Sequence, residues 1–226
     1  MAAPRRRGRK VLILIIVLLV IAGLLFALDR VAAAYTARRI ATTLQNEGFP
    51  VRPNVSVEGF PFLTQLITRH LEGVEVTAAR FPVGPVTASI DVHGQNITLD
   101  PGYRSGTIAQ VRGTGLIPFA SLAALPALAA VPGLQITSDG PDKVKLSANL
   151  QVLTASAIAR VKQTARNQIS LRIVSSSGVP ASLLAPIRDL ILRIPALPLG
   201  LTVHSVTVSP RGVVIGVTGN NVKFGH

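Results

Sequence analysis

Residues 11–28 read VLILIIVLLVIAGLLFAL, an apolar stretch without a charged residue. As a helix it is about 27 Å long, close to the hydrocarbon thickness of a bilayer. The residues before it, RRRGRK at 5–10, include five cations, and clustered cations stay on the cytoplasmic side of a membrane. We therefore expect a protein of the cell membrane whose later residues face the periplasm or another extracytoplasmic space.

This stretch is typical of a permanent single-pass transmembrane anchor or of a signal peptide that is cleaved. It is longer than the usual core of a signal peptide, which favours the anchor. Ala32, Ala33 and Ala34 offer a cleavage site, although Asp29 and Arg30 lie directly before them. Both alternatives divide the chain at the same place. Residues 1–30 form a basic cytoplasmic stub with the membrane segment, and residues 31–226 form the extracytoplasmic domain.

The extracytoplasmic part is basic and lacks cysteine. Six of the 23 Lys and Arg and one of the 10 Asp and Glu lie in residues 1–30, so the remainder carries a net charge of +8. This charge favours an anionic membrane surface or acidic lipid headgroups. We do not expect nucleic acid as a partner, because no Lys/Arg run follows residue 10 and the chain has two Tyr and no Trp for base stacking. Without cysteine, stability must come from an apolar core.

The hydrophobic pattern after the membrane segment predicts an α+β fold. Helical spacing continues over residues 31–46, in one rod with the membrane segment or as a short stalk, and Gly48 and Pro50 end it. Most of the remainder alternates as strands do, most clearly over 143–152. A short helix is predicted after the turn at Phe60-Pro61-Phe62, and a further helix from Pro186 to Ile194. The expected strands are 55–58, 71–100 with a turn at 81–85, 107–112, 143–152, 156–165, 168–175 and a hairpin of 201–208 with 213–217.

Two apolar segments stand apart from this pattern. Four of the seven Phe, at 49, 60, 62 and 81, lie within 33 residues and form either an aromatic core plug or one end of an apolar ligand cavity. Residues 119–131, FASLAALPALAAV, are apolar all round and are split by Pro126. They are too short to span a bilayer and predict either a buried helix or a lip that dips into the membrane or caps a lipid cavity.

No pattern in the chain indicates catalysis. The four histidines, at 70, 93, 204 and 226, lack the spacing of metal ligands, and no cysteine can join them. The chain contains neither a G-x-S-x-G nucleophile elbow nor a phosphate-binding loop. Asp139 and Asp142 flank Gly-Pro, which favours a turn. We therefore expect no enzyme activity, no catalytic or metal-binding residue and no cofactor.

Residues 55–65, VSVEGFPFLTQ, resemble the LmeA-like family of exported phospholipid-binding proteins of the bacterial envelope. The order of parts is also similar: an apolar N-terminal segment, a helix with Asp29-Arg30, this motif and a β-rich remainder. The resemblance covers roughly residues 29–220. It implies a tubular lipid-binding fold, in which a curved antiparallel sheet wraps a helix around an apolar groove. It also implies an anionic, phosphatidylinositol-type phospholipid and a role in maturation of lipoglycans such as lipomannan.

The expected function is therefore binding of a phospholipid whose acyl chain lies in an apolar groove. The alternative is a membrane-anchored adaptor or structural protein for an envelope glycosyltransferase, with a solid core and no lipid. Arg69 and His70 are candidates for contacting a headgroup phosphate, although adjacent polar residues at a helix end are often only exposed. The candidate groove residues are Phe60, Phe62, Leu63, Leu66, Ile67, Ile187, Leu190, Ile191 and Ile194.

Overall fold

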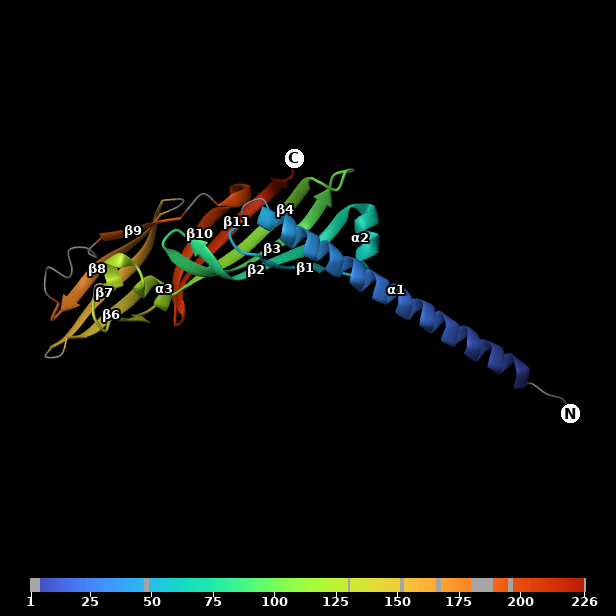
Figure 1. The fold of residues 1–226 in the computed structure, drawn as a ribbon, viewed down its shortest axis with the longest axis horizontal. Helices are drawn as coiled ribbons and strands as arrows, with labels where there is room; N and C mark the ends of the chain where they lie inside the picture. The colour runs from blue at the N-terminus through green and yellow to red at the C-terminus, as the bar shows by residue number, and fades with distance from the viewer. Residues whose placement is uncertain are drawn as a thin grey trace.

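The computed structural model describes residues 5–46, 49–129, 131–150, 153–165, 168–179, 189–194 and 197–225. A long helix, α1, projects from one end of an elongated β-rich body (Figure 1). The described strands form two antiparallel sheets, one ordered β1-β2-β3-β4-β11-β10 and the other β5-β6-β7-β8-β9. The predicted α+β class with antiparallel sheets is confirmed.

The helices and strands follow one another in a simple order. They are α1 (Arg5–Asn46), β1 (Asn54–Glu58), α2 (Phe62–Thr68), β2 (His70–Val83), β3 (Val86–Leu99), β4 (Gly106–Pro118), α3 (Phe119–Ala123), α4 (Pro126–Ala129), β5 (Gln135–Ser138), β6 (Lys143–Leu150), β7 (Leu153–Ala165), β8 (Gln168–Ser177), β9 (Asp189–Arg193), the 3-10 turn η2 (Pro198–Gly200), β10 (Thr202–Ser209) and β11 (Gly212–Phe224).

Helix α1 joins the apolar stretch and the following helical stripe into one continuous rod. Among the described residues it is the one helix long and apolar enough to cross a membrane. Its side chains from Lys10 to Leu28 are exposed, whereas Ala33, Ala37 and Ala41 are buried. Alanines four residues apart lie on one face of a helix, and their small side chains let the end of α1 pack closely on β1 and β2. The first half of α1 is therefore free to enter a bilayer while the second half belongs to the β-rich body.

The six-stranded sheet differs from the sequence expectation at the turn between β2 and β3 and in the length of β4. The turn predicted at 81–85 shrinks to Gly84 and Pro85, because residues 81–83 pair with residues 86–88. Strand β4 extends beyond the predicted 107–112 because residues 113–115, Gly-Thr-Gly, also pair with β3 and β11. Gly113 allows this, since a Cβ there would lie 2.9 Å from Val92 Cγ2. The predicted hairpin around residues 209–212 is confirmed.

The helix predicted from Pro186 to Ile194 is wrong over the described residues, because 189–193 form strand β9. This strand pairs with β8, and its side chains alternate: Leu190 and Leu192 face the core while Ile191 is 56 % exposed. A short run of Leu and Ile satisfies helical and strand spacing alike, and sheet pairing decides between them. Ile187 lies outside the described residues.

The main core lies where the two sheets meet. It buries side chains of β3, β4, β10 and β11 against side chains of β6, β7 and β8. The segment predicted as a buried helix or a membrane lip forms the two short helices α3 and α4, and Leu125 and Leu128 from it are buried in this core. The segment therefore packs Leu125 and Leu128 inward, whereas Ala120, Ala124 and Ala129 are exposed.

Candidate functional site

An apolar cavity of about 40 Å³ lies inside the main core, which we call the interior cavity. Its lining residues come from β4 and β11 of one sheet, from β5 to β9 of the other and from the α3–α4 segment. Strands β6, β8 and β9 lie at the end of the body far from the start of α1 (Figure 1). All of its lining side chains are aliphatic. They are Ile117, Leu122, Leu125, Leu128, Ile136, Val144, Leu146, Val161, Ile169, Leu171, Leu190, Leu192 and Val213.

The chemistry of this lining restricts what the interior cavity can hold. A cavity without polar groups offers water no hydrogen-bond partner, and a dry apolar cavity of about 150 Å³ can bind a ligand as small as benzene. The interior cavity is smaller than that, so as it stands it is too small for an acyl chain. Two hydrogen bonds tie the sheets together, from Val208 N to Pro141 O (2.7 Å) and from Gln163 Nε2 to Val203 O (3.1 Å).

A second feature lies where α1 enters the β-rich body. We call it the membrane-proximal junction and define it by Asp29, Arg30 and residues 59–65. Asp29 Oδ1 accepts a hydrogen bond from Leu63 N (2.8 Å), and Asp29 Oδ2 pairs with Arg30 Nη2 (2.7 Å). Arg30 Nη2 also donates to Gly59 O (3.0 Å). The Asp29-Arg30 pair and the G-F-P-F-L motif, far apart in sequence, are thus parts of one contact.

The Gln65 side chain completes the junction. Its Nε2 donates to Glu58 O (3.3 Å) at the end of β1, and its Oε1 accepts from Glu72 N (2.8 Å) in β2. Gln65 is buried, so α2 is held between two strands by an amide whose polar atoms are both satisfied. Gly59 makes room for it: its φ is +89°, and a Cβ there would meet the Gln65 amide and lie 2.5 Å from Glu72 Oε2.

Asp29 lies directly after the apolar stretch and keeps its charge there. Burial raises its pKa, whereas hydrogen bonds from the Leu63 amide, the Arg30 side chain and the Phe62 amide lower it. The lowering effects dominate, so the pKa of Asp29 lies below its ordinary value. A carboxylate at this position is tolerable because its lone pairs are used within the protein.

The predicted groove residues separate into two groups at opposite ends of the body. Phe62 and Leu66 pack in a small core under the end of α1, with Ala33, Leu71 and Ile97. Phe60, Leu63 and Ile67 are exposed beside α1, with exposed fractions of 56, 39 and 78 %.

The other group lies at the far sheet. Leu190 lines the interior cavity, Ile194 is buried in the main core and Ile191 is exposed. The structure does not bring the two groups together. Arg69, half-buried at the end of α2, and His70, exposed at the start of β2, lie with the first group.

The four phenylalanines expected as one cluster are also divided. The ring of Phe49 packs on Phe81, with centroids 4.8 Å apart, while Phe60 packs on Phe26 at 5.5 Å. Phe62 is 1 % exposed. Phe62 therefore fills a core, as the core-plug alternative expects, whereas Phe60 faces outward and does not line the interior cavity.

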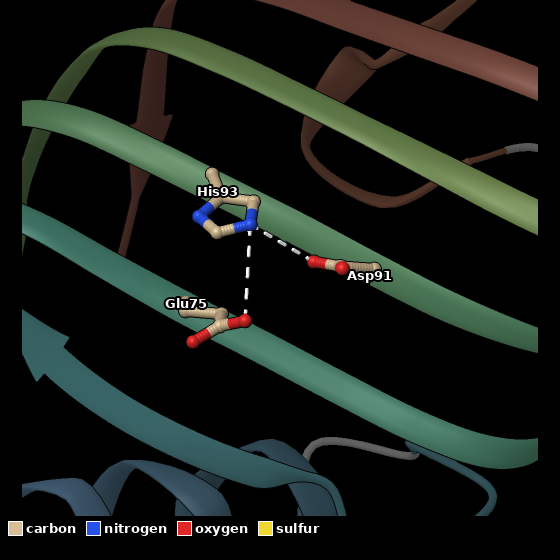
Figure 2. A group of neighbouring side chains, drawn as sticks. All are labelled: Glu75, Asp91 and His93. Atoms are coloured by element: carbon tan, nitrogen blue, oxygen red, sulfur yellow. Dashed lines mark ion pairs between the residues drawn. The ribbon is translucent and has the colours of Figure 1, made fainter.

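The third feature is a group of polar side chains on the surface of β2 and β3. His93 Nε2 is 3.0 Å from Asp91 Oδ1 and 3.8 Å from Glu75 Oε1 (Figure 2). One ligand atom from each of the three lies within 4.8 Å of the others, which is the arrangement that a divalent cation could share. The half-exposed side chains equally form an ordinary surface ion-pair group. Asp91-x-His93 was visible in the sequence, but its approach to Glu75 depends on strand register.

A family model described as LmeA-like phospholipid-binding matches residues 27–218. The chain belongs to the LmeA-like phospholipid-binding family. The match begins just before Asp29 and includes the membrane-proximal junction and every residue that lines the interior cavity. Neither curated proteins nor solved structures gave a match. As a member of the LmeA-like family the protein is a phospholipid-binding protein, and its N-terminal helix is a candidate membrane span or signal anchor.

Proposed function

We propose that this LmeA-like protein is a membrane-anchored, extracytoplasmic protein that takes the acyl chain of an anionic phospholipid into the interior cavity. Residues 1–30 supply the cytoplasmic stub and the span, and residues 31–226 supply the lipid-binding domain. The orientation follows from the five cations at 5–10, which favour the cytoplasmic side. The observation that carries the proposal is the wholly aliphatic lining of the interior cavity in a member of a phospholipid-binding family.

Hydrocarbon burial supplies the energy for this binding. Each buried methylene contributes roughly 0.8 kcal/mol, and this gain favours a state in which the two sheets, or α3 and α4 over them, stand further apart to admit the chain. The preference for an anionic lipid rests on charge. Residues 31–226 carry a net charge of +8, and Lys143 lies opposite Arg160 across β6 and β7, where Arg160 also pairs with Asp142 Oδ2 (3.2 Å). A phosphatidylinositol-type headgroup matches this charge.

The cellular role that we propose comes from the family resemblance. An anchored carrier or sensor of such a lipid supports maturation of lipomannan-type lipoglycans, beside the envelope glycosyltransferases that elongate them. Deletion of the gene in its host is expected to leave truncated lipoglycans. A deletion mutant with normal lipoglycans would contradict this cellular role but not the proposal that the protein binds a phospholipid.

The lipid-binding proposal is tested with the full chain purified in detergent and analysed for co-purified phospholipid by mass spectrometry. Leu190→Trp puts a large ring into the interior cavity from a partly buried position. We expect it to reduce bound phospholipid about tenfold, which corresponds to about 1.4 kcal/mol. Val174→Trp is the matched control, since Val174 is 44 % exposed on the neighbouring strand β8. Equal phospholipid in both variants and the wild type, or none in any, would contradict the proposal and favour a lipid-free adaptor.

A further inference from the structure

We propose that α2 and the turn before it form a second membrane contact, in which the exposed apolar side chains of Phe60, Leu63 and Ile67 enter the bilayer interface beside α1. We call these three residues the α2 patch. The inference rests on the proposed membrane anchor and goes beyond it, because a single span leaves the body free to swing whereas a second contact fixes its orientation.

The contact between Phe60 and α1 sets the depth of the α2 patch in the bilayer. The Phe60 ring packs on Phe26 at 5.5 Å between centroids. Phe26 lies two residues before the end of the apolar stretch, about 3 Å along the helix axis. When residues 11–28 occupy the hydrocarbon, Phe60 therefore lies at its outer boundary. The Arg30 guanidinium also lies over the Phe60 ring, 5.4 Å from its centroid, two residues beyond the apolar stretch and so at the level of the headgroups.

The other two residues of the α2 patch enlarge the apolar surface formed by Phe60 and Phe26. Leu63 and Ile67 are four residues apart on α2 and so share one helix face, and both are exposed. Helix α2 lies at the end of the body from which α1 projects (Figure 1). The patch is thus continuous with the exposed apolar surface of the span, which identifies the bilayer as its occupant.

Charge at the same end of the body fits a lipid surface. Strand register brings the start of β2, the β3–β4 turn and the end of β11 together, since His70 pairs with Thr98 and Thr107 pairs with Lys223. The exposed or half-buried cations carried there are Arg69, Arg104 and Lys223, beside the carboxylates of Glu72 and Asp100, and Tyr103 is exposed on the turn between β3 and β4. Cations and tyrosine are the side chains that favour the headgroup region. Arg69 and His70 then meet headgroups of the bilayer itself.

The test uses the absence of cysteine in the chain, which allows one fluorescent label per variant. Single Leu63→Cys, Ile67→Cys, Leu19→Cys and Val174→Cys variants of the full chain are labelled with an environment-sensitive dye. They are then reconstituted in vesicles of phosphatidylcholine and phosphatidylglycerol. All four side chains are exposed, so the labels do not disturb the core. Lipids with a nitroxide at a shallow acyl position quench dyes in the interface, and those with a deep nitroxide quench dyes in the bilayer centre.

We expect the shallow nitroxide to quench the labels at 63 and 67, the deep nitroxide to quench the label at 19, and neither to quench the label at 174. Quenching at 19 without quenching at 63 and 67 would overturn the α2 contact while leaving the anchor intact. Labels at 63 and 67 with blue-shifted but unquenched emission would overturn it in favour of a second copy of the chain or another protein. No quenching at 19 would overturn the proposed anchor and the α2 contact together.

Discussion

The backbone amide of Leu63 donates a hydrogen bond to Asp29 Oδ1 across 2.8 Å, and this bond joins the first turn of α2 to α1. Amides in the first turn of a helix have no partner within the helix, and Pro61 before α2 has no side chain that can accept one. A carboxylate from another helix supplies the missing cap. The segment that enters the membrane is therefore coupled to the folded body by a polar contact as well as by apolar packing.

Loss of the Asp29 carboxylate is expected to weaken this coupling. In Asp29→Ala the Leu63 amide in the first turn of α2 loses its acceptor, and Arg30 loses its carboxylate partner. We expect a clear decrease in the melting temperature of the full chain, measured by circular dichroism in detergent. The control is Asp91→Ala, whose exposed ion pair with His93 contributes less than about 1 kcal/mol. A melting temperature no lower in Asp29→Ala than in the control would show that the cap is not needed.

Gly59 is expected to tolerate no side chain. In Gly59→Ala the new methyl group meets the Gln65 amide and the Glu72 carboxylate at a φ of +89°. We expect a loss of about 1–3 kcal/mol in the free energy of unfolding, measured by denaturant titration. Gly84→Ala separates the backbone strain from the contact, because Gly84 also has positive φ but nothing lies within 4 Å of its Cβ position. Equal losses in the two variants would mean that the Gln65 contact has no role.

Phe62 and Phe60 are expected to behave oppositely although both belong to one motif. Phe62→Ala empties a fully buried position and should cost about 3–5 kcal/mol. Phe60→Ala removes a half-exposed ring and its contact with Phe26, and should cost about 0.5–1.5 kcal/mol in detergent. Thermal or denaturant unfolding of the two variants measures the difference. The assignment of Phe62 to a core and Phe60 to a surface would be contradicted if Phe60→Ala were the more damaging change.

Several strands and the helical character of residues 11–46 were predictable because local signals agree there, whereas the sequence left open whether the helix is one continuous rod. Alternation over residues 143–152 and the Ser-Pro-Arg-Gly turn at 209–212 leave little choice of structure, and strands β6, β10 and β11 follow. The segment 189–193 was not predictable, because its five residues fit the spacing of a helix as well as that of a strand. Pairing with β8 decides that it forms a strand. That partner cannot be identified from local spacing.

The candidate site was predictable only in part for a similar reason. The motif at 59–65 was recognised, but its residues have three different surroundings. Phe62 fills a core, Phe60 is exposed beside Phe26, and Gln65 bridges two strands. Which side a residue faces depends on contacts with α1, whose Asp29 lies about 30 residues earlier. Of the predicted groove residues, Leu190 alone lines the interior cavity, and the segment 119–131, for which a cap over a lipid cavity was one alternative, adds Leu122, Leu125 and Leu128. The other walls come from strands that read simply as core.

Enlarging the interior cavity is expected to destabilise the protein in a way that phospholipid repairs. Leu128 is 1 % exposed and lines the cavity, so Leu128→Ala should cost about 2–5 kcal/mol without lipid. A ligand that fills the enlarged space stabilises the folded state by mass action. We expect added phospholipid to raise the melting temperature of Leu128→Ala more than that of the wild type. Leu71→Ala, at a buried position in the other core, is the control and should show no such extra gain.

The location of the bound acyl chain is measured most directly by photocrosslinking the full chain to a phospholipid that carries a diazirine in its acyl tail. The crosslinked residues are then mapped by mass spectrometry. We predict crosslinks on the walls of the interior cavity, at residues 122–128 of the covering helices and at 136, 144, 146, 190 and 192 of the far sheet. These are in addition to crosslinks along the span at 11–28. Crosslinks confined to the span and the α2 patch, with none on the cavity walls, would contradict the account.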